Sequence, residues 1–266
     1  MTHPVTSRWV RTLARVYALG AAALFPTSLI AGVWLYVSLG SPAAAPPSPF
    51  AASSSLAATA AVLVNVLLFG VFALHHSLLA RTHAKVWLTR RVPASLERST
   101  YVLIASVLFL LMVAAWQPVP GVVYRVEGWP AWVLRGIQIA GIGLTLLAAK
   151  AIDPFELAGL RQAFADDADP LAAANAGLSA NTDGPDDIFT STGLYGLVRH
   201  PIYFAWLLMV WPTPVMTSGR LTFAAVTSAY LVLAIPWEER ALIARHGAFY
   251  QRYRDRVRWR LLPGIY

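Results

Sequence analysis

The chain of 266 residues contains no cysteine. Disulfides, thiolate metal sites, iron–sulfur clusters and a cysteine nucleophile are therefore excluded. Charge is also scarce, because 13% of the residues are charged and 57% are hydrophobic, whereas a soluble domain is about a quarter charged. Residues 16–80 hold no Asp, Glu, Lys or Arg. This composition indicates a membrane protein and argues against disordered, collagen-like and coiled-coil chains.

Six segments are apolar and long enough to be candidate membrane-spanning helices, since a bilayer core of about 30 Å needs roughly 20 residues. They are residues 17–39, 56–79, 99–116, 132–149, 202–217 and 221–237. We read the first as a retained helix and not as a secretory signal. A tight turn at 218–220 joins the last two, which predicts a helical hairpin. The expected fold is all-α and polytopic, with a C-terminal hairpin and an amphipathic cytoplasmic tail.

We expect a single membrane-embedded domain over residues 1–266, divided into four parts. These are an N-terminal helix and loop (1–55), core helices (56–150), an acidic cytoplasmic loop (151–192), and a hairpin with a C-terminal tail (193–266). The acidic loop holds eight of the thirteen acidic residues. Its middle, 165–185, is rich in Ala, Asp, Asn and Gly, which is typical of a flexible solvated loop.

The distribution of basic residues predicts the orientation. Eighteen of the 21 Lys and Arg fall at the N-terminus, after the second and fourth spans, or in the C-terminal tail. Only Arg125, Arg135 and Arg220 fall on the other side. Both termini are therefore expected in the cytoplasm. The spread of positive charge over every cytoplasmic segment argues against nucleic acid as a partner, and the arginine-rich tail suits anionic lipid headgroups.

Two polar motifs are expected to meet on the cytoplasmic face, because the last two spans are antiparallel. One runs from Gly193 to Tyr203 and includes Arg199 and His200 as donors. Its Pro201 fits the first turn of a helix, whose free N–H groups favour an anion. The other contains Glu238 and Glu239 and is followed by several tyrosines. Together they suit a ligand with separated positive and negative groups, although Arg199 and Glu238 pairing to fasten the hairpin is an alternative.

These motifs resemble the isoprenylcysteine carboxyl methyltransferase superfamily of membrane enzymes. The shared pattern is Arg199-His200-Pro201-x-Tyr203, then Glu238-Glu239, Gly247, Tyr250, Tyr253, Val257 and Pro263. The resemblance implies S-adenosylmethionine as cofactor. It also implies a set of cofactor-binding residues, namely Gln162, Tyr195, Arg199, His200, Pro201, Ile202, Tyr203, Glu238 and Tyr250.

Further motifs look like the bacterial methanethiol S-methyltransferase branch of this superfamily. They are His75-His76-Ser77, Glu97-Arg98-Ser99-Thr100-Tyr101, Trp116-x-Pro118-x-Pro120 and Gly159-Leu160-Arg161-Gln162. The isoprenylcysteine enzymes carry a substrate-binding Arg one turn before the Glu pair, where this chain has Ala234. The resemblance thus implies a bacterial inner-membrane enzyme that methylates a small thiol, methanethiol to dimethyl sulfide. Carboxyl methylation of isoprenylcysteine, or another lipophilic acceptor, is the alternative.

Methyl transfer to a thiol needs a thiolate, which is the nucleophile. His76, near Arg81, is the candidate base, and Arg199 and Glu239 are the other candidate catalytic residues. A structural role between helices is the alternative for His75 and His76. We expect no metal, since His75 and His76 are neighbours and point to different faces of a helix, where they cannot share an ion.

Two other functional classes stay open from the residues alone. A sterol-type NADPH reductase shares the Arg-His-Pro-x-Tyr element and a similar ending over 261–266, but usually has Asn where this chain has Ile202. A transporter or assembly factor is the second class. Charges are scarce within the spans, which gives a transport path little support.

Overall fold

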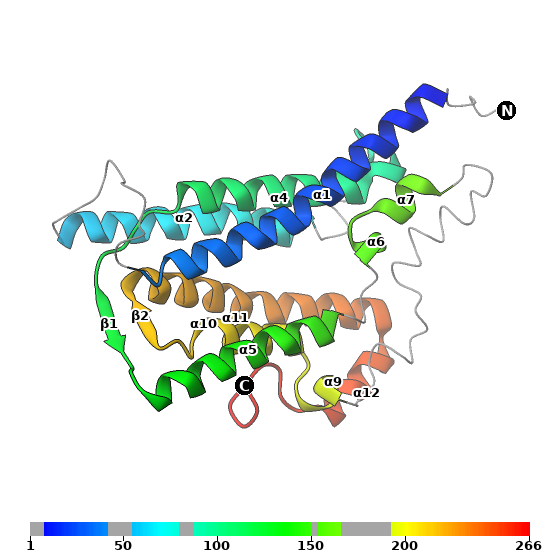
Figure 1. The fold of residues 1–266 in the computed structure, drawn as a ribbon. Coiled ribbons are helices and arrows are strands. Elements are labelled where there is room, and N and C mark those ends of the chain that lie inside the picture. The colour runs from blue at the N-terminus through cyan, green and yellow to red at the C-terminus, as the bar shows by residue number, and fades with distance from the viewer. Residues whose placement is uncertain (1–7, 42–54, 80–87, 150–153, 166–192) are drawn as a thin grey trace. The chain divides into compact units, whose positions relative to one another are not determined.

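A computed structural model describes residues 8–41, 55–79, 88–149, 154–165 and 193–266 (Figure 1). Five helices in this part of the chain are apolar and long enough to cross a membrane. They are Trp9–Ser38, Ser55–Leu78, Ala94–Ala115, Trp129–Ala148 and Ser218–His246. The protein is therefore an all-α polytopic membrane protein, as its composition predicts.

Three of the five long helices begin and end close to the predicted spans, but the first begins nine residues earlier and the last ends nine residues later than predicted. Their bounds are α1 (Arg8–Ser38), α2 (Ser55–Leu79), α4 (Glu97–Ala115), α5 (Trp129–Ala149) and α11 (Ser218–His246). The shorter elements are η1 (Ala94–Leu96), α6 (Pro154–Leu157), α7 (Leu160–Phe164), α9 (Gly193–Leu197), α10 (Pro201–Val210) and α12 (Ala248–Arg256). Most of the predicted acidic loop, including residues 166–192, lies outside the described residues, so its flexibility stays a prediction.

The fifth predicted span is shorter than expected. Helix α10 has 10 residues, which at 1.5 Å per residue is about 15 Å, half the thickness of a bilayer core. Pro212 and Pro214 follow it closely and cannot continue a helix. The predicted turn at 218–220 is also wrong, because these residues form the first turn of α11. Thr217 caps that helix by accepting a hydrogen bond from the Arg220 amide.

A two-stranded antiparallel ribbon, which sequence reasoning missed, takes the place of the predicted tight turn. Strands β1 (Val122–Arg125) and β2 (Val215–Thr217) pair with Val122 opposite Thr217 and Arg125 opposite Val215. The ribbon is labelled in Figure 1. The consecutive Val122, Val123 and Tyr124 suit a strand by their branched and aromatic side chains. The chain therefore passes from α10 to α11 through extended backbone.

The chain divides into two compact units. One comprises Met1–Trp34, Gly70–Ala115 and Ile152–Thr182, and the other comprises Leu35–Phe69, Trp116–Ala151 and Asp183–Tyr266. In the first unit, the Tyr17 hydroxyl donates to Thr100 and the Ser99 hydroxyl donates to the carbonyl of Gly159. Gly159 has a φ of 78°. A Cβ there would lie 2.6 Å from the Ser99 amide, so glycine permits this close approach.

In the second unit, α5 packs tightly against α10. A Cβ at Gly141 of α5 would lie 2.9 Å from the carbonyl oxygen of Ala205 in α10. The end of α10 leaves backbone carbonyls without helical partners, and polar side chains satisfy two of them. Gln138 donates to the carbonyl of Met209 at 2.8 Å, and the Tyr36 hydroxyl donates to that of Val210 at 2.9 Å. These bonds make a broken helix tolerable inside a membrane protein.

Candidate active site

The site begins where the chain enters α10. Pro201 is the first helical residue and His200 is the N-cap, as the motif predicts, since a proline at this position loses no helical hydrogen bond. The ring of His200 stacks on the ring of Tyr203, one turn along, with centroids 5.4 Å apart and planes 11° apart. Both rings are thereby fixed at the start of the helix.

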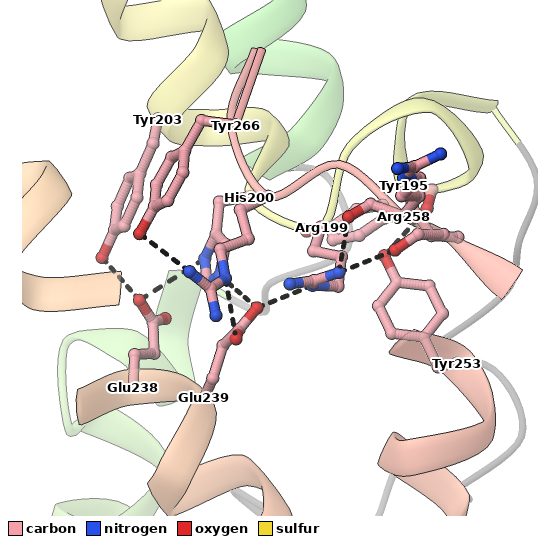
Figure 2. Close-up of polar contacts among 11 residues, drawn as sticks. Tyr195, Arg199, His200, Tyr203, Glu238, Glu239, Tyr253, Arg258 and Tyr266 are labelled. Carbon is pink, nitrogen blue, oxygen red and sulfur yellow. Dashed lines mark hydrogen bonds and ion pairs between the residues drawn. The ribbon is translucent and has the colours of Figure 1, made fainter. Parts of the chain in front are cut away.

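The two glutamates of α11 have different surroundings. The Glu238 side chain is 44% exposed, whereas that of Glu239 is 4% exposed. Tyr203 donates to Glu238 Oε2 at 2.8 Å. His200 lies between the two carboxylates, with Nδ1 3.6 Å from Glu238 and Nε2 3.6 Å from Glu239 (Figure 2). Glu238 therefore offers an accessible carboxylate, and Glu239 does not.

Buried Glu239 is held by arginines. Arg199 Nε lies 2.6 Å from Glu239 Oε1, and Arg260 Nε lies 3.3 Å from Oε2. The alternative that Arg199 pairs with Glu238 is therefore wrong, because Arg199 pairs with Glu239. Two basic side chains compensate for the burial of one carboxylate, which is the condition under which a charge is tolerated in a protein interior.

A C-terminal segment, residues 257–260, lies along the entry to α10. Arg199 Nη1 donates to the carbonyls of Val257 and Arg258 at 2.8 and 2.9 Å. The backbone amides of Arg199 and His200 donate to the carbonyls of Trp259 and Arg260, each at 2.9 Å. Of its five side-chain donors, Arg199 thus commits two to residues 257–260 and a third to Glu239. It fastens the C-terminal segment beside His200.

Tyrosines of α12 complete the support. Tyr250 and Tyr253 are buried with Val257, and the Tyr253 hydroxyl donates to the carbonyl of Tyr195 in α9 at 2.8 Å. Burial raises the pKa of both α12 tyrosines, so their hydroxyls stay protonated at neutral pH. Burial, and then the charge of Glu238, raises the pKa of Tyr195.

The structure brings most of the predicted site residues into one unit. These are Tyr195, Arg199, His200, Pro201, Ile202, Tyr203, Glu238, Glu239 and Tyr250. Tyr250 is a core residue, only 1% exposed. Sequence reasoning left out Arg260, which it counted only as a topology charge, and Tyr266, which accepts from Arg260. No local sequence signal points to Arg260, because its contact with Glu239 depends on the C-terminal segment returning to the start of α10.

The remaining two candidates, His76 and Gln162, belong to the other unit. His76 Nδ1 lies 2.9 Å from the Tyr101 hydroxyl, and its ring stacks on Phe72. The Arg98 guanidinium lies over the Tyr101 ring, 5.7 Å from its centroid. Gln162 Oε1 is buried and has no hydrogen-bond partner among the described residues. Within those residues no cluster of side chains suits a metal ion.

Comparison with known proteins identifies the family. The chain is 41% identical to methanethiol S-methyltransferase 2 of Bradyrhizobium diazoefficiens over 197 residues, 74% of this chain and 71% of that protein. It is 34% identical to methanethiol S-methyltransferase 1 of the same organism over 252 residues, covering 94% and 82%. It is 41% identical to methanethiol S-methyltransferase of Mycobacterium tuberculosis over 208 residues, covering 76% and 78%. The chain belongs to the methanethiol S-methyltransferase family.

This result confirms the resemblance seen in the motifs and makes the protein a methyltransferase that uses a methyl donor. No family model matches the chain. No solved structure matches it either. Membership of this family argues against the two other classes, a sterol-type reductase and a transporter or assembly factor.

Proposed function

We propose that the protein transfers a methyl group from S-adenosylmethionine to methanethiol, which gives dimethyl sulfide. Relatives named methanethiol S-methyltransferase align with most of the chain. The observation that carries the proposal is the exposed carboxylate of Glu238, which Tyr203 orients beside the stacked ring of His200. A cationic ligand with hydroxyl groups is the natural partner of such a carboxylate.

The residues at the entry to α10 fit this cofactor. A carboxylate accepts about four hydrogen bonds, and Glu238 uses one of them on Tyr203, so the rest are available for the ammonium or the ribose diol. The start of α10, where the amide of Ile202 lies in the first turn of the helix, suits the cofactor carboxylate. The tyrosine and histidine rings suit the adenine or the sulfonium. When bound, the cofactor supplies a methyl group carried on a sulfonium.

Arg199 and Glu239 take a positioning role in this proposal, in place of the catalytic one that the sequence suggested. Both side chains are buried. Arg199 donates to Glu239 and to the carbonyls of Val257 and Arg258, and Glu239 also pairs with Arg260. They therefore fix His200 and the start of α10, and leave contact with the ligand to Glu238, His200 and Tyr203.

His76 remains our candidate for taking the proton of the thiol. The S–H bond would break, the proton would pass to a ring nitrogen of His76, and the electron pair left on sulfur would form the new S–CH₃ bond. The methyl–sulfonium bond of the donor would break at the same time, and its electron pair would leave with S-adenosylhomocysteine. The contact of Nδ1 with the Tyr101 hydroxyl holds the ring in one orientation. That contact uses one of the two ring nitrogens of His76, and we assign the other, Nε2, to the thiol.

Ala234 supports a small, uncharged acceptor. The isoprenylcysteine enzymes that the sequence resembles place a substrate-binding arginine at this position, one turn before the Glu pair. A cation there would serve an acceptor carboxylate, and alanine cannot. We also propose the inner membrane of a bacterium as the location, with both termini in the cytoplasm, because the basic residues gather on that side.

The test is methyl transfer by the purified full-length protein with labelled S-adenosylmethionine. Methanethiol, a larger alkyl thiol and a farnesylated cysteine analogue are compared as acceptors. We expect label in volatile dimethyl sulfide. Label recovered as a base-labile ester on the farnesyl compound would instead establish carboxyl methylation, and would show that another cation replaces the one missing at Ala234.

A further inference from the structure

The last turn of α11 and the tail that follows it carry a strongly basic surface. Between residues 240 and 266 the chain has seven arginines and one acid, Asp255. Five of these arginines are exposed, namely Arg240, Arg245, Arg252, Arg256 and Arg258. Helix α12 follows α11 after a single residue, Gly247, so its first turn starts at the membrane surface if α11 spans the bilayer.

Aromatic rings accompany three of the exposed arginines. Arg240 lies 5.0 Å from the ring centroid of Trp237, Arg252 lies 5.6 Å from that of Phe249, and Arg258 lies 5.1 Å from that of Trp259. Tryptophan is enriched at membrane interfaces, and arginine extends its charged head from apolar surface toward headgroups. Amphipathic pairs of this kind, repeated along one segment, are typical of a surface that lies on lipid.

The same segment supports the candidate cofactor site through its backbone. Arg256 and Arg258 present exposed side chains, while the carbonyls of residues 257–260 accept hydrogen bonds from Arg199 and from the amide of His200. A ligand that binds the exposed side chains of Arg256 and Arg258 would therefore also order the backbone carbonyls that bond to Arg199 and His200. His200 stands beside Glu238, 3.6 Å from its carboxylate.

We propose that Arg252, Arg256 and Arg258 bind the headgroups of anionic phospholipids, and that this binding raises the affinity of the neighbouring site for its cofactor. The second half of this inference rests on the function proposed above, and the first half does not. Positive charge near a membrane attracts anionic lipid. A lipid that orders residues 257–260 lowers the ordering cost that the cofactor otherwise meets, and coupling of this kind typically changes an affinity by about fivefold or more.

The experiment uses the full-length protein in nanodiscs of phosphatidylcholine alone or with about a third phosphatidylglycerol. Two quantities are measured in each bilayer. One is the hydrogen exchange of amides over residues 248–260, and the other is the dissociation constant of S-adenosylhomocysteine by calorimetry. We expect slower exchange and about fivefold tighter binding in the anionic bilayer. Inorganic phosphate added to the neutral nanodiscs is expected to reproduce neither effect.

A charge-matched pair of variants assigns the effect to the tail. Arg252→Gln with Arg256→Gln removes two charges one turn apart on α12 and should abolish both gains. Arg90→Gln with Arg91→Gln removes two exposed charges elsewhere and should keep them. Equal exchange in both bilayers would overturn the lipid surface. Slower exchange with unchanged affinity would overturn the coupling. Slower exchange without any cofactor binding would overturn the proposed function and leave the lipid surface standing.

Discussion

Arg199 donates from Nε to Glu239 Oε1 at 2.6 Å, and both side chains are about 95% buried. This pair joins α10 to α11 and, through Arg199 Nη1, joins both to residues 257–260. Removing one member of a buried ion pair leaves the other charge uncompensated. The pair is therefore a structural element on which the geometry of the neighbouring exposed glutamate depends.

The first prediction concerns this pair. Glu239→Ala or Arg199→Ala should destabilise the protein by about 3–5 kcal/mol, because each leaves a buried charge without its partner. Thermal and chemical unfolding of the detergent-solubilised protein measure this effect. Arg125→Ala, which removes an exposed arginine from β1, is the control and should change stability little. Wild-type stability in Arg199→Ala, with loss of cofactor binding alone, would instead make Arg199 a direct ligand.

The second prediction concerns the exposed member of the glutamate pair. Glu238→Gln should weaken binding of S-adenosylhomocysteine by at least about tenfold, because a hydrogen bond to a charged group contributes roughly 1.5–3 kcal/mol. Its stability should stay near that of the wild type, because the side chain is exposed. Calorimetry and thermal unfolding of the same preparation measure the two effects. The matched control is Glu127→Gln, an exposed glutamate before α5, and equal affinity in both variants would contradict the assignment.

The long helices could be predicted from sequence because a long apolar segment without charge is stable only in a bilayer or in a protein core. The predicted span 56–79 and helix α2, Ser55–Leu79, agree closely for this reason. The predicted span 202–217 is wrong because Pro212 and Pro214 lie within it, and prolines end a helix whatever their neighbours. The β-ribbon was missed because three paired residues give no clear alternating pattern.

The sequence predicts which residues make up the candidate site, but it does not predict which of the two glutamates pairs with Arg199. Glu238 and Glu239 are adjacent, and neighbouring residues on a helix point in different directions. Only packing decides which of them is buried, and with it which one Arg199 meets. The role of Arg260 depends on residues 257–260 returning to the start of α10. That contact joins positions about 60 apart in sequence, so no local pattern reports it.

The third prediction tests how Glu238 is oriented. Tyr203→Phe removes the hydroxyl that donates to Glu238 Oε2 at 2.8 Å but keeps the ring that stacks on His200. Cofactor affinity should fall, but by less than in Glu238→Gln, since the carboxylate remains and loses only the partner that orients it. Tyr124→Phe removes an exposed hydroxyl bonded to a backbone carbonyl at 3.4 Å and should have no effect. A normal affinity in Tyr203→Phe would mean that Glu238 needs no orienting partner.

The fourth prediction concerns the packing of α5 on α10. Gly141→Ala places a Cβ 2.9 Å from the carbonyl oxygen of Ala205, so the helices must separate, at a cost of about 1–3 kcal/mol. Gly143→Ala on the same helix meets nothing within 4 Å and should be neutral or slightly stabilising, since alanine favours a helix by roughly 0.5–1 kcal/mol. Thermal unfolding of the two variants side by side measures the difference. Equal melting temperatures would show that α5 and α10 do not pack this closely.

The fifth prediction separates thiol chemistry from cofactor binding. His76→Gln should lower kcat for methanethiol by about 10²–10⁴, the usual contribution of a general base, and leave the affinity for S-adenosylhomocysteine unchanged. Tyr101→Phe removes the hydroxyl that lies 2.9 Å from His76 Nδ1 and should give a smaller loss in kcat, because the ring remains but is no longer oriented.

The control for the fifth prediction lies in the same unit. Tyr17→Phe removes a hydroxyl bonded to Thr100, the residue next to Tyr101, and should keep the wild-type kcat. Single-turnover rates with saturating methanethiol measure the chemical step for all three variants. If His76 were structural, His76→Gln would lower stability and cofactor affinity together. If His76→Gln folds, binds S-adenosylhomocysteine normally and still transfers methyl at the wild-type rate, His76 takes no part in the reaction. If His76 is a base that Tyr101 orients, the loss of kcat should be largest in His76→Gln, smaller in Tyr101→Phe and absent in Tyr17→Phe.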